Sequence, residues 1–362
     1  MTVPVPGRDG AIDVLRGVFI VLMVSTHVSD GSVIQGGLHL QRWFTGAEGF
    51  VMLSGLVLGM VHRRRVARLG DRAAAILILR RAGTLYAIQI ALCVAVVVIA
   101  LATGRPSSVP PLEALGGVPG TAISIALLRF QPNFLDILPM YVVFLLAAPA
   151  VLWAIRWNAV AVLAVSVGLW ATAQVWPSIG QLADPIFGDA AFQILAWQLL
   201  FVLGLVAGSR GEDLAGRLRR DHSALVVVSA VALVALVALA QLDRPSVGAI
   251  HVPPALTSRP VLGPVRLAEF LAFVVVALAA LGWLRDRGAF DRGPAAVPAD
   301  WLAALGRRSL ASFQLLTVIA IALVVAGVKS WPDPAVELTT LVVMAILFVA
   351  ARSRAAARLI PN

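Results

Sequence analysis

The chain has 362 residues, of which 60% are hydrophobic and only 13% are charged. Soluble domains are about 45–50% apolar and about 25% charged, so the composition excludes a set of ordinary soluble domains. The formal charge of +10 is carried by short arginine clusters between apolar runs. That pattern is a membrane-topology signal and not the basic stripe of a protein that binds nucleic acid.

Ten apolar stretches are long enough to cross a bilayer, which takes about 20 residues each. We therefore predict an all-α polytopic helix bundle, with residues 1–362 forming a single integral membrane domain. The predicted spans are residues 12–30, 44–62, 80–103, 134–154, 158–176, 189–208, 222–241, 264–284, 308–328 and 333–353. Residues 119–130 are apolar but too short to span, and we expect a re-entrant or interfacial segment there.

The distribution of basic residues predicts the orientation of the bundle. With the N-terminus inside, the inner segments hold 21 basic residues and the outer segments hold 7. Because positive residues are retained on the cytoplasmic side, this asymmetry predicts that both termini are cytoplasmic. Cys93 is the only cysteine, which excludes a disulfide within the chain and a cysteine-based metal site.

Ionisable residues in the first span are the first functional candidates, because charges inside a bilayer are costly and usually face the bundle interior. Arg16 and His27 are eleven residues apart, which places them within about 20° of one helix face and about 16 Å apart along the axis. Asp13 is three residues before Arg16 and can pair with it. The alternative is that Arg16 snorkels to the inner interface and that His27 makes an interhelical hydrogen bond.

Other polar residues in apolar surroundings have a functional and a structural interpretation, and the sequence leaves both open. Glu48 points into the bundle or lies among outer headgroups, and it shares a face with Gly55 and Gly59, which allow close helix packing. Asp136 is a site acid or a first-turn acid favoured by the helix dipole. The remaining candidates are Tyr141, Trp197, Gln198, and the residues Arg307, Arg308 and Ser309 of the segment LGRRSL.

These segments together resemble the OpgC family, whose founding members succinylate osmoregulated periplasmic glucans, within the acyltransferase-3 group of membrane O-acyltransferases. The resemblance runs from about Arg8 to about Leu316. It is carried by RDGAIDVLRG, AEGFVMLSG, FLDILPMY, AWQLLFVLG and LGRRSL, and by an arginine and a histidine separated by ten residues in the first span.

The resemblance implies a multi-pass protein of the bacterial inner membrane, in contact with lipid, that moves an acyl group, with succinyl expected, from cytoplasmic acyl-CoA to a hydroxyl of an extracytoplasmic glycan. His27 would be the general base, with Glu48 or Asp136 stabilising its imidazolium form. Arg16 would hold the pantetheine arm or polarise the thioester. The CoA phosphates would meet four further arginines, Arg80, Arg81, Arg307 and Arg308. No metal is expected, and the oligomeric state is not predicted.

Two other classes of function are compatible with the same residues. A proton-coupled transporter or flippase could use His27, Glu48, Asp136 and Glu269 as a proton relay. Transporters more often contain inverted repeats and pairs of broken helices, and the sequence shows neither. A non-catalytic membrane scaffold is the third class, and it leaves the Arg16–His27 face and Glu48 without a role.

Overall fold

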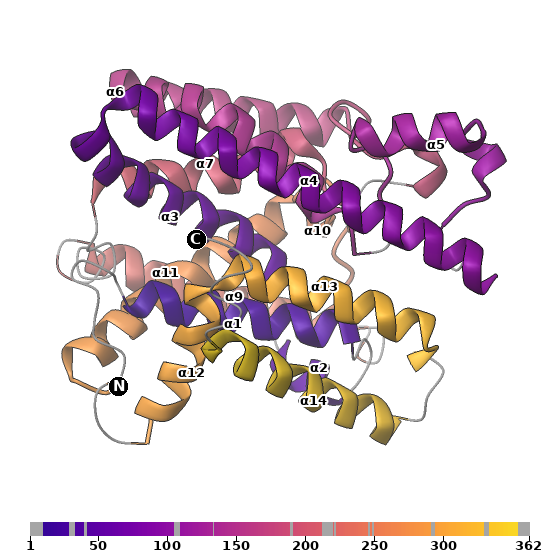
Figure 1. Cartoon of the computed structure of the whole chain (residues 1–362). Coiled ribbons are helices and arrows are strands. Elements are labelled where there is room, and N and C mark those ends of the chain that lie inside the picture. The colour runs from indigo at the N-terminus through magenta and orange to yellow at the C-terminus, as the bar shows by residue number, and fades with distance from the viewer. Residues whose placement is uncertain are drawn as a thin grey trace. The chain divides into compact units, whose positions relative to one another are not determined.

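The computed structural model describes residues 10–28, 33–39, 42–104, 109–132, 134–188, 191–211, 220, 222–244, 247, 250–290, 294–328 and 333–353. All elements in these ranges are helical, as the composition predicts (Figure 1). Parts of the predicted spans 12–30 and 189–208 lie outside the described residues. So do eight residues of the basic-residue count, namely Arg8, Arg105, Arg217, Arg219, Arg292, Lys329, Arg354 and Arg358.

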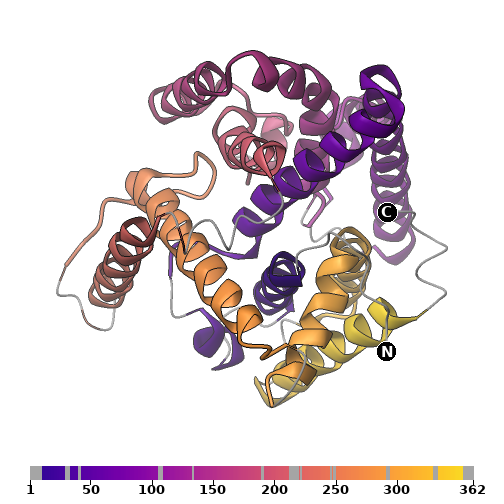
Figure 2. The same ribbon diagram turned by 90° about the vertical axis from the view of Figure 1, so that its left-hand side faces the viewer.

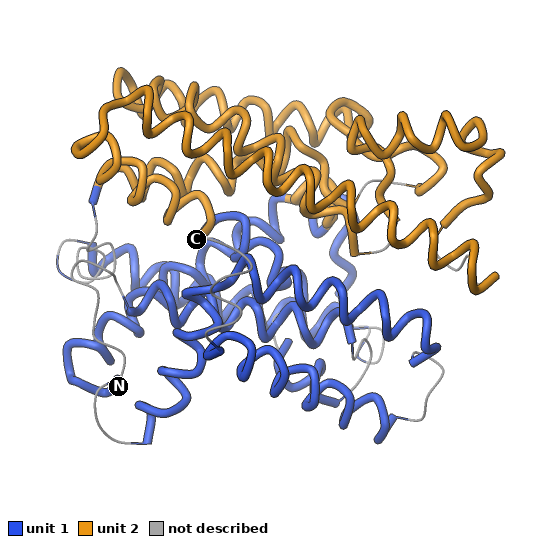
Figure 3. The backbone as a smooth tube through the Cα atoms, in the orientation of Figure 1, with its two compact units in different colours: residues 1–53, 211–257, 264–362 blue, residues 54–210, 258–263 orange. Residues whose placement is uncertain are grey.

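The chain forms two compact units that are interleaved in sequence (Figure 3). Unit 1 comprises residues 1–53, 211–257 and 264–362, and unit 2 comprises residues 54–210 and 258–263. The chain therefore passes between the units four times, once within a single helix.

Unit 1 is built around its first helix. It contains α1 (Gly10–Val28), α2 (Val33–Leu38), the first residues of α3 (Gly46–Leu69), α9 (Ser223–Leu242), α10 (Pro254–Thr257), α11 (Pro264–Asp286), α12 (Ala296–Arg307), α13 (Ser309–Val325) and α14 (Asp333–Arg352). Thirteen of the 19 residues of α1 are buried. This helix contacts α2, α11, α12, α13 and α14, and Figure 2 shows it nearly end-on among its neighbours.

Small residues bring α1 and α12 together. A Cβ at Gly17 would lie 2.1 Å from the carbonyl oxygen of Leu302, and one at Gly306 would lie 1.8 Å from that of Asp13. Neither space admits a methyl group, so glycine at both positions allows the two backbones to touch, as in small-residue packing of membrane helices. Immediately after Gly306 the chain bends by 83° between α12 and α13.

Unit 2 packs long apolar helices against one another. It contains residues 54–69 of α3, α4 (Asp71–Thr103), the 3₁₀ turn η1 (Leu112–Leu115), α5 (Gly117–Ala126), α6 (Ile137–Val175), η2 (Pro185–Phe187) and α7 (Ile194–Arg210). The close packing predicted from Gly55 and Gly59 is confirmed, because Cβ atoms there would lie 2.2 Å from the Phe201 oxygen and 2.6 Å from the Leu205 oxygen.

Within the described ranges, six helices are long and apolar enough to cross a membrane, and the bent pair α12–α13 makes a seventh candidate. Every predicted span overlaps one of the helices, but one prediction differs in detail. The spans 134–154 and 158–176 correspond to the two helical parts of α6, which a kink at Asn158 separates close to the predicted link. The span 80–103 belongs to a helix that begins already at Asp71. The count of about ten spans and the orientation of the termini stay predictions.

Candidate functional site

One end of the polar face of α1 is anchored to the bend between α12 and α13. Nη1 of Arg16 lies 4.0 Å from Oδ1 of Asp13, and Nη2 of Arg16 donates a hydrogen bond to Oγ of Ser309. Ser309 is the first residue of α13 and is buried. The segments DVLRG and LGRRSL are therefore brought together, and Gly17 and Gly306 are the residues that allow this close contact.

His27 lies near the other end of α1 and is half-buried. Its Nδ1 lies 2.7 Å from the carbonyl oxygen of Met23, one turn earlier, and Oγ1 of Thr26 lies 3.3 Å from the same nitrogen. A carbonyl oxygen only accepts hydrogen bonds, so Nδ1 carries a proton in this arrangement. In the neutral ring the lone pair is then on Nε2, which is the form that a general base requires.

A second histidine approaches α1 one turn from His27. Nε2 of His39 lies 2.8 Å from Oγ of the buried Ser25 and 3.3 Å from the carbonyl oxygen of Leu22. His39 follows α2 and lies outside the long apolar helices. Burial lowers its pKa below 6.5, and the Leu22 hydrogen bond and the charge of Glu48 oppose that shift only in part.

Glu48 is fully buried at the start of α3, where it serves two structural purposes. Its Oε2 accepts hydrogen bonds from the backbone N–H of Thr45, at 2.9 Å, and from the Thr45 hydroxyl, at 3.1 Å. The segment Thr45-Gly-Ala-Glu48 therefore forms a capping box that begins the helix. Its Oε1 accepts from Nε of Arg266, on α11, at 2.5 Å.

Among the described residues, all hydrogen bonds of Glu48 go to Thr45 and Arg266. Arg266 is 5% exposed, so this is a buried ion pair. The predicted role of Glu48, stabilising the imidazolium form of His27, stays a prediction. In this structure the Glu48 carboxylate is engaged by Thr45 and Arg266. The capping-box pattern was readable in the sequence, whereas the pairing with Arg266 was not.

Glu269 lies one turn after Arg266 on α11 and is also fully buried. Its Oε2 accepts a hydrogen bond from the backbone N–H of Trp43 at 3.3 Å. Its Oε1 has no hydrogen-bond partner in the described part of the chain. Since an ionised carboxylate is costly to bury without hydrogen bonds, this position suits a neutral carboxyl group. Only the transporter alternative had singled out Glu269.

Asp136 and Tyr141 belong to unit 2. Asp136 is the N-cap residue of α6, and the charge of Arg259 acts on its carboxylate. Tyr141 is 3% exposed, and its ring packs edge-on against Phe201 with centroids 6.1 Å apart. The placement fits the first-turn interpretation of Asp136, and a catalytic role for it stays a prediction.

Trp197 and Gln198 have structural contacts in unit 2. The indole Nε1 of Trp197 donates to the carbonyl oxygens of Arg259 and Pro260, each at 3.1 Å. Gln198 joins α7 to α6, because its Oε1 accepts from Oγ of Ser166 at 2.7 Å and its Nε2 donates to the Ser166 carbonyl at 2.8 Å. These hydrogen bonds fit the structural interpretation of Gln198.

The four arginines expected to meet CoA phosphates are divided between the units. Arg80 and Arg81 lie on α4 in unit 2, with Arg80 exposed. In unit 1, Nη2 of Arg307 lies 3.7 Å from Oδ1 of Asp300, and Nη1 of Arg308 donates to the carbonyl oxygen of Ser353 at 2.5 Å. Arg307 thus lies near the Asp300 carboxylate, whereas Arg308 ties the bend to the end of α14.

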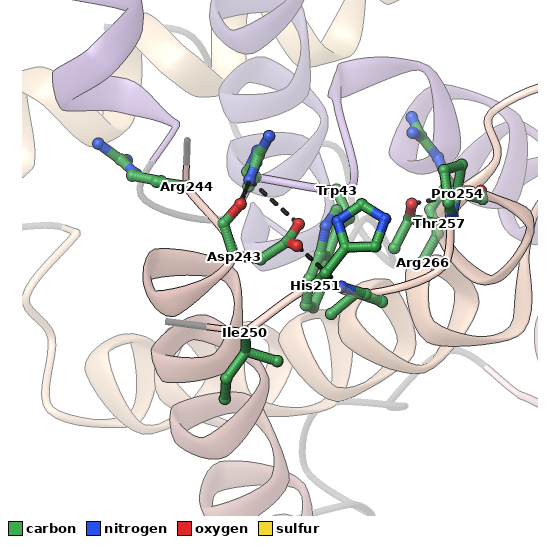
Figure 4. A pocket seen from close by; sticks show the side chains of 10 residues that line it. Trp43, Asp243, Arg244, Ile250, His251, Pro254, Thr257 and Arg266 are labelled. Carbon is green, nitrogen blue, oxygen red and sulfur yellow. Dashed lines mark hydrogen bonds and ion pairs between the residues drawn. The ribbon is translucent and has the colours of Figure 1, made fainter. Parts of the chain in front are cut away.

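A cavity of about 630 Å³ opens in unit 1 between the end of α9, residues 250–257, the segment before α3 and the start of α11 (Figure 4). Its polar lining includes Arg42, Asp243, Arg244, His251 and Arg266, beside the ring of Trp43. Arg266 therefore joins the cavity wall to Glu48. These polar residues could not be grouped from the sequence, because they come from four separate segments.

The motifs of α1 and of the α12–α13 bend, which meet in the structure, both lie within the region that matches a known protein family. The family model described as "OpgC protein" matches residues 8–358. The chain belongs to the OpgC family. The match extends through α14, beyond the limit of about Leu316 that the motifs suggested. No curated protein and no solved structure matches the chain. OpgC membership indicates a transferase role in glucan modification, and the long apolar helices indicate a membrane protein.

Proposed function

We propose that this OpgC-family protein is a membrane O-acyltransferase that moves an acyl group, succinyl in the first instance, from cytoplasmic acyl-CoA to a hydroxyl of an extracytoplasmic glycan. The observation that carries the proposal is the 2.7 Å distance between Nδ1 of His27 and the carbonyl oxygen of Met23. With the proton on Nδ1, the lone pair of the neutral ring is on Nε2, near the end of α1 that the predicted topology places on the outer side.

In the proposed reaction, Nε2 of His27 takes the proton of a sugar hydroxyl as the oxygen attacks the thioester carbonyl carbon. The resulting tetrahedral intermediate collapses by breaking the C–S bond, and the imidazolium returns its proton to the departing CoA thiolate. The products are the acylated sugar and free CoA. The Met23 carbonyl keeps the ring oriented and stabilises the imidazolium when it forms.

Arg16 is proposed to act on the donor. Nearly buried and held by Asp13 and Ser309 beside the bend, it has a guanidinium that could hold the pantetheine arm. The separation of about 16 Å along α1 from His27 favours this role over polarising the thioester. The phosphates of CoA are proposed to meet Arg80, Arg81, Arg307 and Arg308. Arg308 would first have to leave the Ser353 carbonyl to reach a phosphate.

Acyl transfer by two His27 variants in proteoliposomes tests the proposal. We expect His27→Ala and His27→Gln to lose about 10²- to 10⁴-fold in turnover, because glutamine keeps a hydrogen-bonding group but cannot take the proton. A purely structural hydrogen bond contributes about 0.6 kcal/mol, and glutamine would largely replace it. A His27→Gln protein with more than about a tenth of the parental rate would return His27 to a structural role.

Proton-coupled transport is the second candidate, and Glu269 is the observation that favours it. A buried carboxyl group with an unpartnered oxygen beside Arg266 and Glu48 is the type of group that carries protons in transporters. Proton flux into liposomes that contain the protein distinguishes the two functions. A glycan gradient would drive the flux, and a pH-sensitive dye would report it. Flux that disappears in Glu269→Gln without any acyl transfer would favour the transporter.

A further inference from the structure

We infer that the cavity of unit 1 is a binding site for a neutral sugar unit, with Arg42, Asp243 and His251 as residues that determine its specificity. Calling this sugar the acyl acceptor rests on the proposed function, whereas the binding itself does not. The size of the cavity, the pairing of most of its charges and the mixture of polar and apolar groups in its wall all favour such a ligand.

The charges in the wall are mostly paired. Nη1 of Arg42 donates to the backbone oxygen of Asp243 at 2.6 Å and to its Oδ2 at 3.1 Å. Arg266 is paired with Glu48 at 2.5 Å. Figure 4 shows that Arg244 extends away from Asp243 and His251. The centre of the cavity therefore has little net charge, which disfavours an anionic ligand and suits hydroxyl groups.

The polar groups are also held in place before any ligand binds. Oδ1 of Asp243 accepts the backbone N–H of Val252 at 2.9 Å, which fixes the carboxylate that in turn holds Arg42. The exposed His251 ring lies over the cavity beside Asp243 (Figure 4). The Arg42 guanidinium and the Asp243 carboxylate thus offer donors and acceptors in fixed positions, and the exposed imidazole adds a further polar group, as the alternating polarity of sugar hydroxyls requires.

The remaining wall is apolar. Trp43 is 4% exposed and packs with Ala240 and Val252, and Ile250 and Pro254 also line the cavity. A pyranose ring has apolar C–H faces as well as hydroxyls, so it matches a wall of this kind. Ligand sites typically measure about 300–1,000 Å³, and the 630 Å³ cavity lies in that range.

The position of the cavity links it to the catalytic helix proposed above. Arg42, Arg244 and Arg266 all come from segments predicted to be extracytoplasmic, which is the side of the glycan. From the cavity wall, Arg266 contacts Glu48, the charge of Glu48 acts on His39, and His39 contacts Ser25, two residues before His27. Two contacts and the electrostatic interaction between Glu48 and His39 therefore connect the cavity wall to the segment of α1 that contains His27.

Binding without donor tests the inference, using purified full-length protein and native mass spectrometry. The probes are neutral β-gluco-oligosaccharides that differ in linkage, together with oligogalacturonates as acidic counterparts. We expect at least one neutral probe to bind, and we expect His251→Ala and Arg42→Gln to weaken it about ten-fold, as for loss of a hydrogen bond to a charged group. Arg287→Gln, an exposed arginine of unit 1 outside the cavity, is the matched control and should leave binding unchanged.

Three outcomes would overturn the inference. The first is that no neutral probe binds the parent, and the second is that both cavity variants bind like the parent. The third is a preference for acidic probes that is lost in Arg244→Gln, which would make the cavity an anion site. Acyl transfer is measured separately. If both variants transfer the acyl group with an unchanged acceptor KM, the cavity is not the acceptor site, but the acyltransferase function stands. If the protein binds the sugar but transfers no acyl group, the acyltransferase function is wrong, but the sugar site stands.

Discussion

Glu48 illustrates how one residue can look catalytic and yet be fully occupied by the fold. Its carboxylate begins α3 through Thr45 and neutralises Arg266 inside unit 1. A buried ion pair is strongly destabilised when only one partner is removed, because the other charge is left uncompensated. The contribution of Glu48 to stability must therefore be separated from any contribution to acyl transfer.

Paired substitutions separate the two contributions. Glu48→Gln keeps the helix-capping group but removes the charge, so we expect a loss of about 3–5 kcal/mol in unfolding free energy. The double variant Glu48→Gln with Arg266→Met should recover most of that stability. Unfolding in detergent, monitored by circular dichroism, provides the measurement. If the double variant is as unstable as the single one, the ion pair is not the source of the loss.

The pKa of His39 gives unit 1 a dependence on pH. Because burial lowers this pKa in the folded state below its ordinary 6.5, the unfolded chain binds the proton more readily. The stability contributed by neutral His39 is complete above about pH 6.5 and is lost as the pH falls toward the folded-state value. We expect His39→Gln, which can still hydrogen-bond to Ser25, to flatten the acidic side of the stability profile. Parallel profiles for the two proteins would contradict this.

Sequence analysis could place residues that share one helix but not those brought together from distant segments. The Arg16–His27 face follows from helical periodicity, and the Asp13–Arg16 pair follows from i,i+3 spacing. Arg266 is 218 positions from Glu48, and nothing in either apolar run indicates that the two meet. The cavity was missed for the same reason, since Arg42, Asp243 and His251 come from loops whose approach depends on tertiary packing.

At the scale of whole helices, the contact between α1 and the α12–α13 bend is the most constrained feature. The bend exposes the start of α13 to Arg16, and it can do so only because Gly306 allows α12 to touch the backbone of α1. The sequence motifs marked both partners, yet periodicity alone could not show that they pack together. The two spans predicted within α6 were recognisable from the sequence, because the kink at Asn158 lies close to the polar link around Arg156.

Substitution of one methyl group tests that contact. Gly306→Ala would place a Cβ 1.8 Å from the Asp13 carbonyl, and overpacking of this kind costs about 1–3 kcal/mol. Gly83→Ala, on an open face of α4, is the matched control and should be neutral or slightly stabilising, since alanine favours the helix. Thermal unfolding in the same detergent compares them. Equal melting temperatures for both variants would mean that the bend tolerates displacement.

For the molecule as a whole, the orientation in the membrane is the prediction on which the proposed sites depend. Fusions of a reporter after residues 70 and 290 should report the cytoplasm, and a fusion after residue 112 should report the exterior, because of the 21 to 7 split of basic residues. Alkaline phosphatase activity identifies an exterior position, and green fluorescent protein fluorescence identifies a cytoplasmic one. Opposite readings at two of the three positions would reverse the sides proposed for donor and glycan.

The interleaving of the two units also has a consequence for the order of events during synthesis. The helix α1 leaves the ribosome early, but the partners that bury Asp13 and Arg16 belong to α12 and α13, translated almost 300 residues later. Until α12 and α13 have been made, Asp13 and Arg16 lack the contacts that separate them from lipid, although unit 2 can already be complete. We therefore expect nascent chains stalled before α12 to be better substrates for membrane proteases than the full chain.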